Sequence, residues 1–303
     1  MNMLFGKILF CVLVCLPLVI QSCGASASLS GLQSELERFV EGKDARIGVA
    51  VIIDGRDTVS VNGTRDFPMM SVFKFPVALA VVDHCAKSGI ALTDTLDIPA
   101  AMIRENTWSP LRERYGVADM RLSIDELLDY SLRFSDNNAC DLLIDFVGGV
   151  ATVDSLMQSY GFSGICISYN EDGMHRDPYL CYVNRSTPLQ MASLFDVFAD
   201  SMRCSSAEMM TIARMLETCD TGRDRLVAPV EGSGVVVGHK TGTGDRNTQG
   251  RLIGVNDCGY FLLPDGSRYV VAVFIADSAY GMDETSQLIA RISEIVYNNV
   301  ARE

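Results

Sequence analysis

Strand-like segments lie at both ends of this chain, and a long helical stretch separates them. Near the N-terminus, an apolar run over residues 47–53, the turn pair Asp54-Gly55 and a second strand pattern over residues 58–62 predict a β-hairpin. Three more strand patterns lie near the C-terminus, at residues 235–243, 252–263 and 268–276. Because consecutive hairpins pair antiparallel, the segments predict one five-stranded antiparallel sheet that joins both ends of the chain.

Helical patterns flank the predicted sheet and fill the middle of the chain. Residues 29–40 and 283–300 have the apolar spacing of amphipathic helices, which would cover the sheet. The middle, residues 71–219, is mostly helical in pattern, with helix ends expected at Gly89, Gly148 and Gly161 and capping boxes at Ser123-Glu126 and Ser205-Glu208. A stretch without regular periodicity, residues 165–185, interrupts it and is predicted to be a functional loop.

These patterns indicate an α/β protein of the α+β type with two lobes. The α/β lobe is expected over residues 28–66 and 225–303, and an inserted all-helical lobe over residues 67–224. Catalytic groups are expected where the lobes meet.

The charge balance argues against one class of partner. The 303 residues carry 25 basic and 38 acidic side chains, for a net charge of -13, and the basic ones form no cluster. Nucleic acid is therefore not an expected partner. Nothing in the sequence indicates a metal, a cofactor or more than a monomer.

The first 27 residues have the layout of a secretory signal peptide. One basic residue, Lys7, precedes an apolar run from Ile8 to Ile20, which is too short for a comfortable transmembrane helix. Two ways of processing the leader are open. Residues 25–27 fit ordinary signal cleavage, whereas residues 20–23 resemble a lipoprotein box, in which Cys23 would be lipidated. Both predict a periplasmic protein, either soluble or lipid-anchored.

The cysteine spacing predicts neither a disulfide framework nor a zinc site. Seven of the ten cysteines lie beyond the leader, without a repeated spacing or a zinc pattern. A disulfide is compatible with export, but most of these cysteines are expected to act as small core residues.

Three short motifs carry the chemistry. Ser71-Val72-Phe73-Lys74 opens an apolar helix, so that Ser71 lies at the helix N-terminus and Lys74 on the same face one turn later. Such a serine can act as a nucleophile, and the amine can accept its proton. The alternative is a capping serine with a solvated lysine, and Pro76 predicts a kink in this helix.

The second motif, Ser135-Asp136-Asn137, falls between two helical segments, where it can point into a cleft or simply cap a helix. The third, Lys240-Thr241-Gly242-Thr243, lies on a predicted strand, where Gly242 permits close approach of a substrate to the backbone. Each motif alone is weak, but all three together in this order are a known signature.

With these motifs, the chain resembles the class A serine β-lactamases, and it is similar above all to the anaerobe-type cephalosporinases. The resemblance implies the shared fold of serine β-lactamases and penicillin-binding transpeptidases, with β-lactams as small-molecule substrates. It implies Ser71 as the acylated nucleophile, Lys74 as its proton-relay partner and Ser135 as proton donor to the ring nitrogen. It further implies an oxyanion hole from the backbone N–H groups of Ser71 and Thr243. Substrate-binding roles fall on Asn137 and on the strand residues Lys240, Thr241, Gly242 and Thr243.

The irregular stretch supplies Glu171, which resembles the family's loop glutamate that activates the deacylating water. His175, four residues on, departs from the asparagine that many members carry there, and is assigned a supporting role in the loop. An efficient deacylating base separates a β-lactamase from two rivals, a D-alanyl-D-alanine carboxypeptidase or transpeptidase and a penicillin sensor. Glu171 therefore favours the β-lactamase.

Further site residues follow from the resemblance. Trp108 in Trp108-Ser109-Pro110 resembles the aromatic wall of the substrate cleft, with a partly buried core aromatic as the alternative. Arg225 resembles a second cation that faces the substrate carboxylate, and Arg223 is a substitute for it. Met70 and Gly244 are not cysteines, so the disulfide of class A carbapenemases is absent, which argues against carbapenem hydrolysis.

Overall fold

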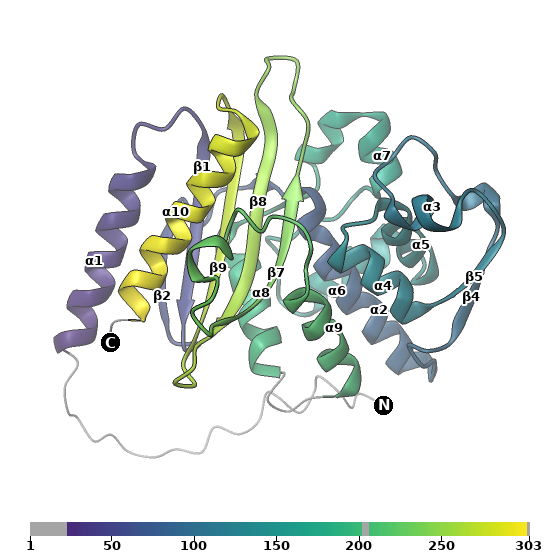
Figure 1. Cartoon of the computed structure of the whole chain (residues 1–303), viewed down its shortest axis with the longest axis horizontal. Helices are drawn as coiled ribbons and strands as arrows, with labels where there is room; N and C mark the ends of the chain where they lie inside the picture. The colour runs from purple at the N-terminus through teal and green to yellow at the C-terminus, as the bar shows by residue number, and fades with distance from the viewer. Residues whose placement is uncertain (1–22, 202–205, 302–303) are drawn as a thin grey trace.

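A five-stranded antiparallel sheet forms the centre of this computed structural model, which describes residues 23–201 and 206–301 (Figure 1). Its strand order is β2-β1-β9-β8-β7, so the two N-terminal strands join the three C-terminal ones as predicted. The strands are β1 (Arg46–Ile53), β2 (Asp57–Val61), β7 (Val236–Thr243), β8 (Leu252–Leu262) and β9 (Arg268–Ser278).

The sheet separates two hydrophobic cores, because successive side chains on a strand point to opposite faces. On one face, α1 (Cys23–Val40) and α10 (Met282–Val300) cover such residues as Val49 and Val271. On the other face, α8 (Pro188–Ser201) packs against β1, β8 and β9, over such residues as Ala50 and Phe274. Figure 1 shows α1 and α10 side by side in front of the sheet, with α8 behind it.

The first hairpin turns as predicted. Asp54 and Gly55 both have positive φ, at 49° and 68°, in a three-residue loop whose Arg56 N–H donates to the Ile53 carbonyl at 3.0 Å. The predicted helix end at Gly89 is also confirmed, with a φ of 68° after α2 (Lys74–Ser88). Gly148 and Gly161 have positive φ two residues beyond their helices.

Most of the segment between β2 and β7 forms the second part of the molecule, on the right of Figure 1, while its helix α8 lies behind the sheet. Its helices in chain order are α2, α3 (Pro110–Tyr115), α4 (Ile124–Arg133), α5 (Asn137–Phe146), α6 (Val150–Ser159), α7 (Glu171–Arg176), α8 and α9 (Ala207–Glu217). Short 3-10 turns also occur here, namely η1 (Met70–Phe73), η2 (Ala100–Met102) and η3 (Pro178–Tyr182), with η5 (Ala228–Val230) following α9. The predicted lobe boundaries stay a prediction.

Four details of the helical middle were predicted wrongly. The middle is not all-helical, since β3 (Phe67–Pro68) pairs with β6 (Arg185–Ser186) and β4 (Thr95–Ile98) with β5 (Met120–Ser123). The irregular stretch holds α7 and η3, and strands and helices of two to six residues are too short to show a period. Ser123 makes no side-chain cap bond, because the Glu126 N–H donates to Asp125 Oδ1 at 2.9 Å, and the Glu126 carboxylate accepts a hydrogen bond from the Tyr115 hydroxyl. The cap of α9 is Ser206, one residue after the predicted one.

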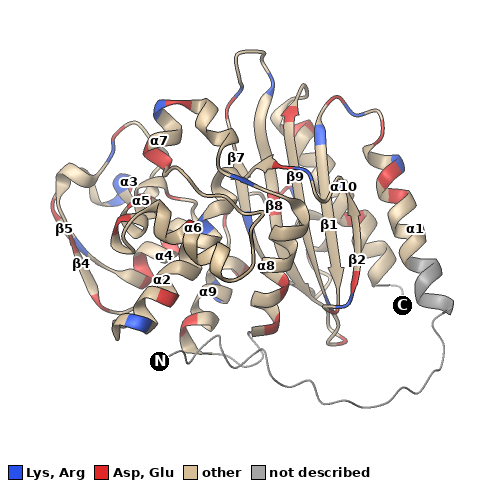
Figure 2. Cartoon of the chain, turned by 180° about the vertical axis from the view of Figure 1, so that it is seen from behind, with Lys and Arg blue, Asp and Glu red and all other residues tan. Residues whose placement is uncertain are grey.

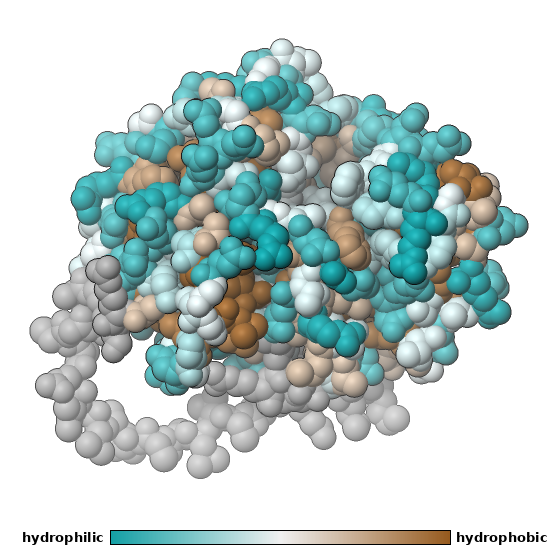
Figure 3. Space-filling model, viewed as in Figure 1, coloured by the Kyte–Doolittle hydropathy of each residue, from teal (hydrophilic) through white to brown (hydrophobic). Residues whose placement is uncertain are grey.

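The surface shows no single charged face. Acidic and basic segments alternate along the ribbon in Figure 2, and Figure 3 shows a mostly hydrophilic face with separate apolar patches. No helix within residues 23–201 and 206–301 has the length and apolar character to cross a membrane.

Residues 1–22 of the predicted leader lie outside the described residues. The six cysteines whose state the structure describes are all free thiols, five of them buried: Cys85, Cys140, Cys166, Cys181, Cys219 and Cys258.

Candidate active site

Ser71 lies on a strained turn held by the sheet. It falls in the 3-10 turn η1, whereas the sequence predicted the first turn of an α-helix. Met70 before it has a φ of 47°, which non-glycine residues seldom adopt. Asn256 of β8 stabilises the turn, since its side-chain amide donates to the carbonyl oxygens of Pro68 at 2.8 Å and Met69 at 3.0 Å. The sheet therefore positions Ser71, the predicted nucleophile.

Helix α2 begins at Lys74, three residues later than predicted. Pro76 thus lies in the first turn, where backbone N–H groups have no intrahelical partner, and α2 continues without a break to Ser88. The predicted kink is therefore wrong.

Lys74 is fully buried and its ammonium group lies among polar partners. Nζ donates to Asn137 Oδ1 at 2.6 Å, to the Ser135 carbonyl at 2.7 Å and to Ser71 Oγ at 3.1 Å, and it pairs with Glu171 Oε1 at 2.9 Å. The solvated lysine of the alternative interpretation is excluded. A buried amine between a serine and a carboxylate can relay a proton.

The Ser135-Asp136-Asn137 segment combines both of its predicted roles. Asp136 caps α5 by accepting from the Ala139 N–H at 2.8 Å, and it also accepts from the Leu111 N–H and the Ser109 hydroxyl. Burial raises the pKa of Asp136, against the effect of these hydrogen bonds. With Asp136 fixed in this way, its neighbours Ser135 and Asn137 face the cleft, and both line it.

Lys240 approaches Ser135 from the opposite side. It is fully buried on β7, and its Nζ donates to Ser135 Oγ at 3.0 Å and to the Thr241 carbonyl at 3.0 Å. Burial lowers the pKa of Lys240 to about 8, and nearby Lys74 acts in the same direction.

Strand β7 runs directly against the nucleophile turn. A Cβ placed on Gly242 would lie 2.5 Å from the Met69 carbonyl and 3.2 Å from the Ser71 nitrogen, so only glycine allows this approach. Together these elements form a catalytic cleft of about 340 Å³. Its lining residues are Met70, Ser71, Trp108, Ser135, Asn137, Glu171, Thr221, Thr241 and Thr243.

Glu171 opens α7 and lies close to the nucleophile. Its Oε1 accepts a hydrogen bond from Ser71 Oγ at 3.4 Å. The first turn of α7 is fixed from α5, where the Asp141 carboxylate accepts from the Glu171 N–H at 2.8 Å and the Asp172 N–H at 3.0 Å. Burial, with the nearby Glu171 charge, raises the pKa of Asp141 to about 7.

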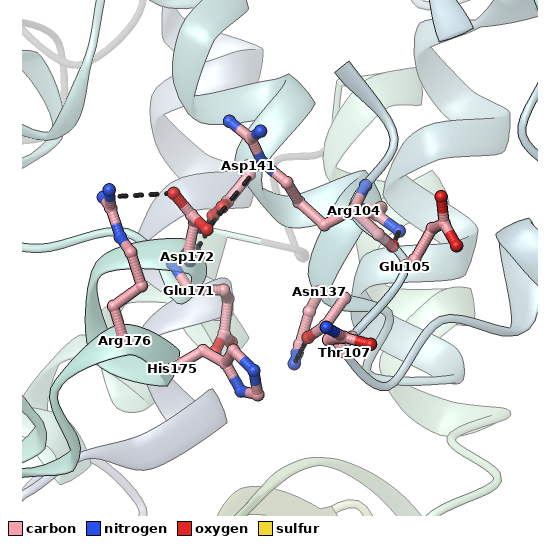
Figure 4. Close-up of a pocket in the computed structure, with 11 residues that line it drawn as sticks. Arg104, Glu105, Thr107, Asn137, Asp141, Glu171, Asp172, His175 and Arg176 are labelled. Carbon is pink, nitrogen blue, oxygen red and sulfur yellow. Dashed lines mark hydrogen bonds and ion pairs between the residues drawn. The ribbon is translucent and has the colours of Figure 1, made fainter. Parts of the chain in front are cut away.

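His175 lies one turn after Glu171 on α7. Both line a second depression of about 400 Å³ beside the catalytic cleft, together with Asn137 and Arg104. Figure 4 shows His175 and Glu171 near each other, with Asn137 facing them across the opening. His175 is thus next to the site, while its effect on the loop stays a prediction.

Trp108 is a surface wall and not a core aromatic. Its side chain is 58% exposed, lines the catalytic cleft, and is anchored by its indole N–H, which donates to the Phe134 carbonyl at 3.0 Å.

The structure separates the two candidate arginines. Arg225 is buried beside the end of β7, and its guanidinium donates to Thr243 Oγ1 at 2.9 Å and to the Gly242 carbonyl at 3.2 Å. Arg223 is exposed and pairs with Glu231 at 3.0 Å. Arg225 is therefore the residue next to the predicted site.

Sequence reasoning missed several residues that shape the cleft. Asp141 lies four residues after Asn137, and this helical spacing could have revealed it. Asn184 had no signal, yet its side chain bonds both the backbone N–H groups of Ser168 and Tyr169 and the Tyr169 carbonyl ahead of α7. Thr221 also had none, although its hydroxyl lies 2.5 Å from that of Thr241. Long-range contacts of this kind leave no local pattern.

Among the described residues, no group of three or more His, Cys, Asp or Glu side chains could hold a metal ion.

The fold and this cluster define a serine hydrolase. The model of the β-lactamase enzyme family matches residues 31–300. A β-lactamase of Bacteroides uniformis is 37% identical over 272 residues, covering 89% of this chain and 91% of that protein. The extended-spectrum β-lactamase PER-1 of Pseudomonas aeruginosa is 33% identical over 273 residues, covering 90% of this chain and 88% of that protein. The solved structure of a class A β-lactamase from Bacteroides cellulosilyticus is 33% identical, covers 91% of this chain and 99% of its own, and superposes with a TM-score of 0.86.

The chain therefore belongs to the β-lactamase enzyme family. Within it, the protein is a class A serine β-lactamase, a hydrolase that opens β-lactams and so provides resistance to them. The predicted family, fold class and enzyme class are confirmed.

Proposed function

We propose that this enzyme hydrolyses cephalosporins and penicillins through an acyl-enzyme on Ser71, which a water activated by Glu171 then breaks down. The observation that carries the proposal is the meeting of three groups: Glu171 Oε1 lies 3.4 Å from Ser71 Oγ and 2.9 Å from Lys74 Nζ, which in turn lies 3.1 Å from Ser71 Oγ. One carboxylate can therefore exchange protons with the nucleophile and its relay.

Acylation would begin when the Ser71 hydroxyl attacks the β-lactam carbonyl carbon. The hydroxyl proton passes to the Lys74 and Glu171 pair, and the new negative charge lies on the carbonyl oxygen. The backbone N–H groups of Ser71 and Thr243 are the proposed oxyanion hole, since Gly242 brings β7 against this turn. The C–N bond of the ring then breaks.

Ser135 is the proposed donor to the departing ring nitrogen. Its Oγ accepts hydrogen bonds from Lys240 at 3.0 Å and from Lys74 at 3.5 Å, so either ammonium can replace the proton that it gives up. Deacylation would follow when Glu171 takes a proton from a water that attacks the ester carbonyl. Ser71 then leaves with a proton and is restored.

The remaining site residues are proposed to bind the substrate. Asn137 would hold the side-chain amide, because its Oδ1 is fixed by Lys74 and its amide nitrogen by Thr107 Oγ1 at 2.8 Å. Lys240 and Thr243 would bind the carboxylate, with Arg225 acting through its bond to Thr243 Oγ1. Trp108 would form one wall of the cleft.

The test is intact-protein mass spectrometry during turnover of a cephalosporin, for wild type, Glu171→Gln and Ser71→Ala. We expect wild type to turn over without a lasting adduct. Glu171→Gln should accumulate an adduct on Ser71, with kcat lower by about 10²- to 10⁴-fold, because a general base contributes that much. Ser71→Ala should form no adduct and show no turnover.

The matched control is Glu294→Gln, which makes the same change on the far helix α10 and should behave as wild type. Hydrolysis that survives Ser71→Ala would contradict the acyl-enzyme. A wild-type enzyme that keeps its adduct indefinitely would instead indicate a penicillin-binding or penicillin-sensing protein.

We further propose that the enzyme acts in the periplasm as a monomer, after export directed by residues 1–27. Whether Cys23 is lipidated follows from the mass of the mature N-terminal peptide, which differs between a diacylglyceryl cysteine and a simple cleavage after Ala27.

A further inference from the structure

A further cavity is lined mainly by the segment that joins α9 to β7 and by β7 itself. Its volume is about 440 Å³. The joining segment lies over the front of the sheet in Figure 1. We call this space the rear cavity, and the residues used below are among those that line it: Glu217, Cys219, Asp220, Glu231, Val237 and His239.

A cysteine, a histidine and an aspartate lie in a row at the wall of the rear cavity. His239 Nδ1 lies 2.8 Å from Asp257 Oδ1, and the Cys219 thiol, which lines the same cavity as His239, interacts electrostatically with the imidazole. The three are 7% exposed for Cys219, 2% for His239 and 0% for Asp257. The row uses none of the groups that the proposed mechanism needs. Its order is that of an activated thiol: a nucleophile, a base and an orienting carboxylate.

The electrostatics of the row favour an ionised thiol. Burial acts against it, but the His239 charge and hydrogen bond lower the pKa of Cys219 to about 7, and Lys240 and the Thr221 hydroxyl add to the effect. Burial also opposes a charged imidazole, yet Asp257 and Cys219 raise the pKa of His239 to about 10. The charge of buried Arg225 also interacts with Asp257 and Cys219.

The other cysteines whose pKa shifts are resolved move the opposite way. Burial raises the pKa of Cys85 to about 11 and of Cys181 to about 12, and it raises the pKa of Cys140 and Cys258 well above the usual value of a thiol. Cys166 is the least buried of the described thiols and has no comparable partner. Reactivity set by exposure alone would therefore favour Cys166.

The rim of the rear cavity suits a small neutral molecule. Its charges are already matched, since Arg133 pairs with Asp220 at 3.2 Å and Arg223 with Glu231 at 3.0 Å. Glu217 accepts a hydrogen bond from the buried Tyr260 hydroxyl at 2.9 Å. Valines line the space between them.

We propose that Cys219, activated by His239 and Asp257, is a covalent modification site for small neutral electrophiles and disulfides that enter the rear cavity, and that its modification slows β-lactam hydrolysis. With a haloacetamide, the sulfur forms a bond to carbon, the carbon–halogen bond breaks and halide leaves. With a small disulfide, a mixed disulfide forms, the original S–S bond breaks, and the departing thiolate takes up a proton. In both cases His239 holds the proton that the thiol has lost.

The route from the thiol to the catalytic cleft is short. Cys219 Sγ lies 3.3 Å from Thr221 Oγ1, which lies 2.5 Å from Thr241 Oγ1, and both threonines line the catalytic cleft. His239 precedes Lys240 on β7. An added group on Cys219 that turns toward Thr221 instead of into the rear cavity would displace Thr221 or β7, because the interior on that side is closely packed. This inhibitory part rests on the proposed function, whereas the modification itself does not.

The first experiment follows iodoacetamide labelling of the folded enzyme by peptide mapping, which reports each cysteine separately. A Cys204→Ser background removes a thiol outside the described residues. We expect Cys219 to be alkylated at least about tenfold faster than the more exposed Cys166 at pH 7.5, because the thiolate is the reactive form. His239→Gln and Asp257→Asn should each slow labelling of Cys219 but not of Cys166, and circular dichroism checks that they fold.

The second experiment measures cephalosporin turnover as the label accumulates. The rate should fall in proportion to Cys219 occupancy, by at least about tenfold at completion. Cys219→Ser should keep its activity in the presence of reagent, while Cys166→Ser should remain as sensitive as wild type. A small disulfide should give the same loss, and a thiol reductant should reverse it.

Three results would overturn the proposal. Faster labelling at Cys166 than at Cys219 would show that Cys219 is not activated. An unchanged labelling rate of Cys219 in both His239→Gln and Asp257→Asn would show the same. Full turnover by an enzyme completely labelled at Cys219 would remove the link to the cleft. An unlabelled enzyme without turnover would contradict the proposed function alone, because the labelling rates would still decide the modification site.

Discussion

Two buried ammonium groups share the Ser135 hydroxyl. Lys240 Nζ lies 3.0 Å and Lys74 Nζ 3.5 Å from Ser135 Oγ, and both lysines are fully buried. Burial and a like charge so close both disfavour the protonated form of Lys240. Glu171 balances Lys74 directly at 2.9 Å, whereas Lys240 pairs only with neutral oxygens. Burial lowers the pKa of Lys240, and the nearby charge of Lys74 adds to the effect.

The pH dependence of substrate capture should report Lys240. Below a pH of about 8 its amine is protonated and attracts the substrate carboxylate, and above that pH the charge is lost. We therefore expect kcat/KM for an anionic cephalosporin to fall several-fold as pH rises from 8 to 9. Lys240→Arg, whose guanidinium stays charged, should lose this alkaline fall even if its activity is lower at every pH. An unchanged alkaline fall in Lys240→Arg would assign it to another group.

Contacts between elements set the shape of the catalytic cleft. Strand β7 approaches η1 at a glycine, Asn256 of β8 holds the same turn, and Asp141 of α5 fixes the start of α7. The nucleophile and the proposed base are thus held from the sheet on one side and from the helices on the other.

A single methyl group should disturb this arrangement. The Cβ of Gly242→Ala would lie 2.5 Å from the Met69 carbonyl, so η1 and β7 must separate. We expect kcat/KM to fall by at least about 100-fold, since loss of one oxyanion donor has that effect. Gly31→Ala is the matched control, because its Cβ meets no atom within 4 Å on α1 and should leave activity unchanged. Equal activity in both variants would show that the cleft tolerates the separation.

Long elements were predictable and short ones were not. The sheet and both terminal helices have enough residues for a period to show, and the turn at Asp54-Gly55 has a chemical signature. By contrast, α7 spans six residues and the extra strands two to four, so only tertiary contacts define them. The same distinction holds in the site. The resemblance of the three motifs to the class A family predicted Ser71, Lys74, Ser135 and Lys240 as neighbours, but no local pattern marks Asn184 or Thr221, whose contacts depend on the finished fold.

At the scale of the molecule, one sheet serves two cores. Along β9, Val271 and Val273 belong to the core under α1 and α10, while Ala272 and Phe274 belong to the core shared with the helical segment. If one core lost its packing, one face of the sheet would be exposed, and the same strands also carry the residues of the other core. The two chain ends also meet in this sheet, because β1 pairs with β9 along eight residue pairs. The molecule is therefore expected to unfold as one unit.

Two matched core substitutions test this expectation. Ile292 of α10 and Leu128 of α4 are both fully buried, one in each core. Each change to alanine should lower the free energy of unfolding by about 2–5 kcal/mol, because it removes packed methyl groups and leaves a cavity. Circular dichroism would follow the whole fold, and fluorescence of Trp108, the only tryptophan, would follow the cleft. We expect the two signals to change together in both variants. If Ile292→Ala lowered the midpoint of one signal and left the other in place, the two cores would be separate folding units, and the shared sheet would not couple them.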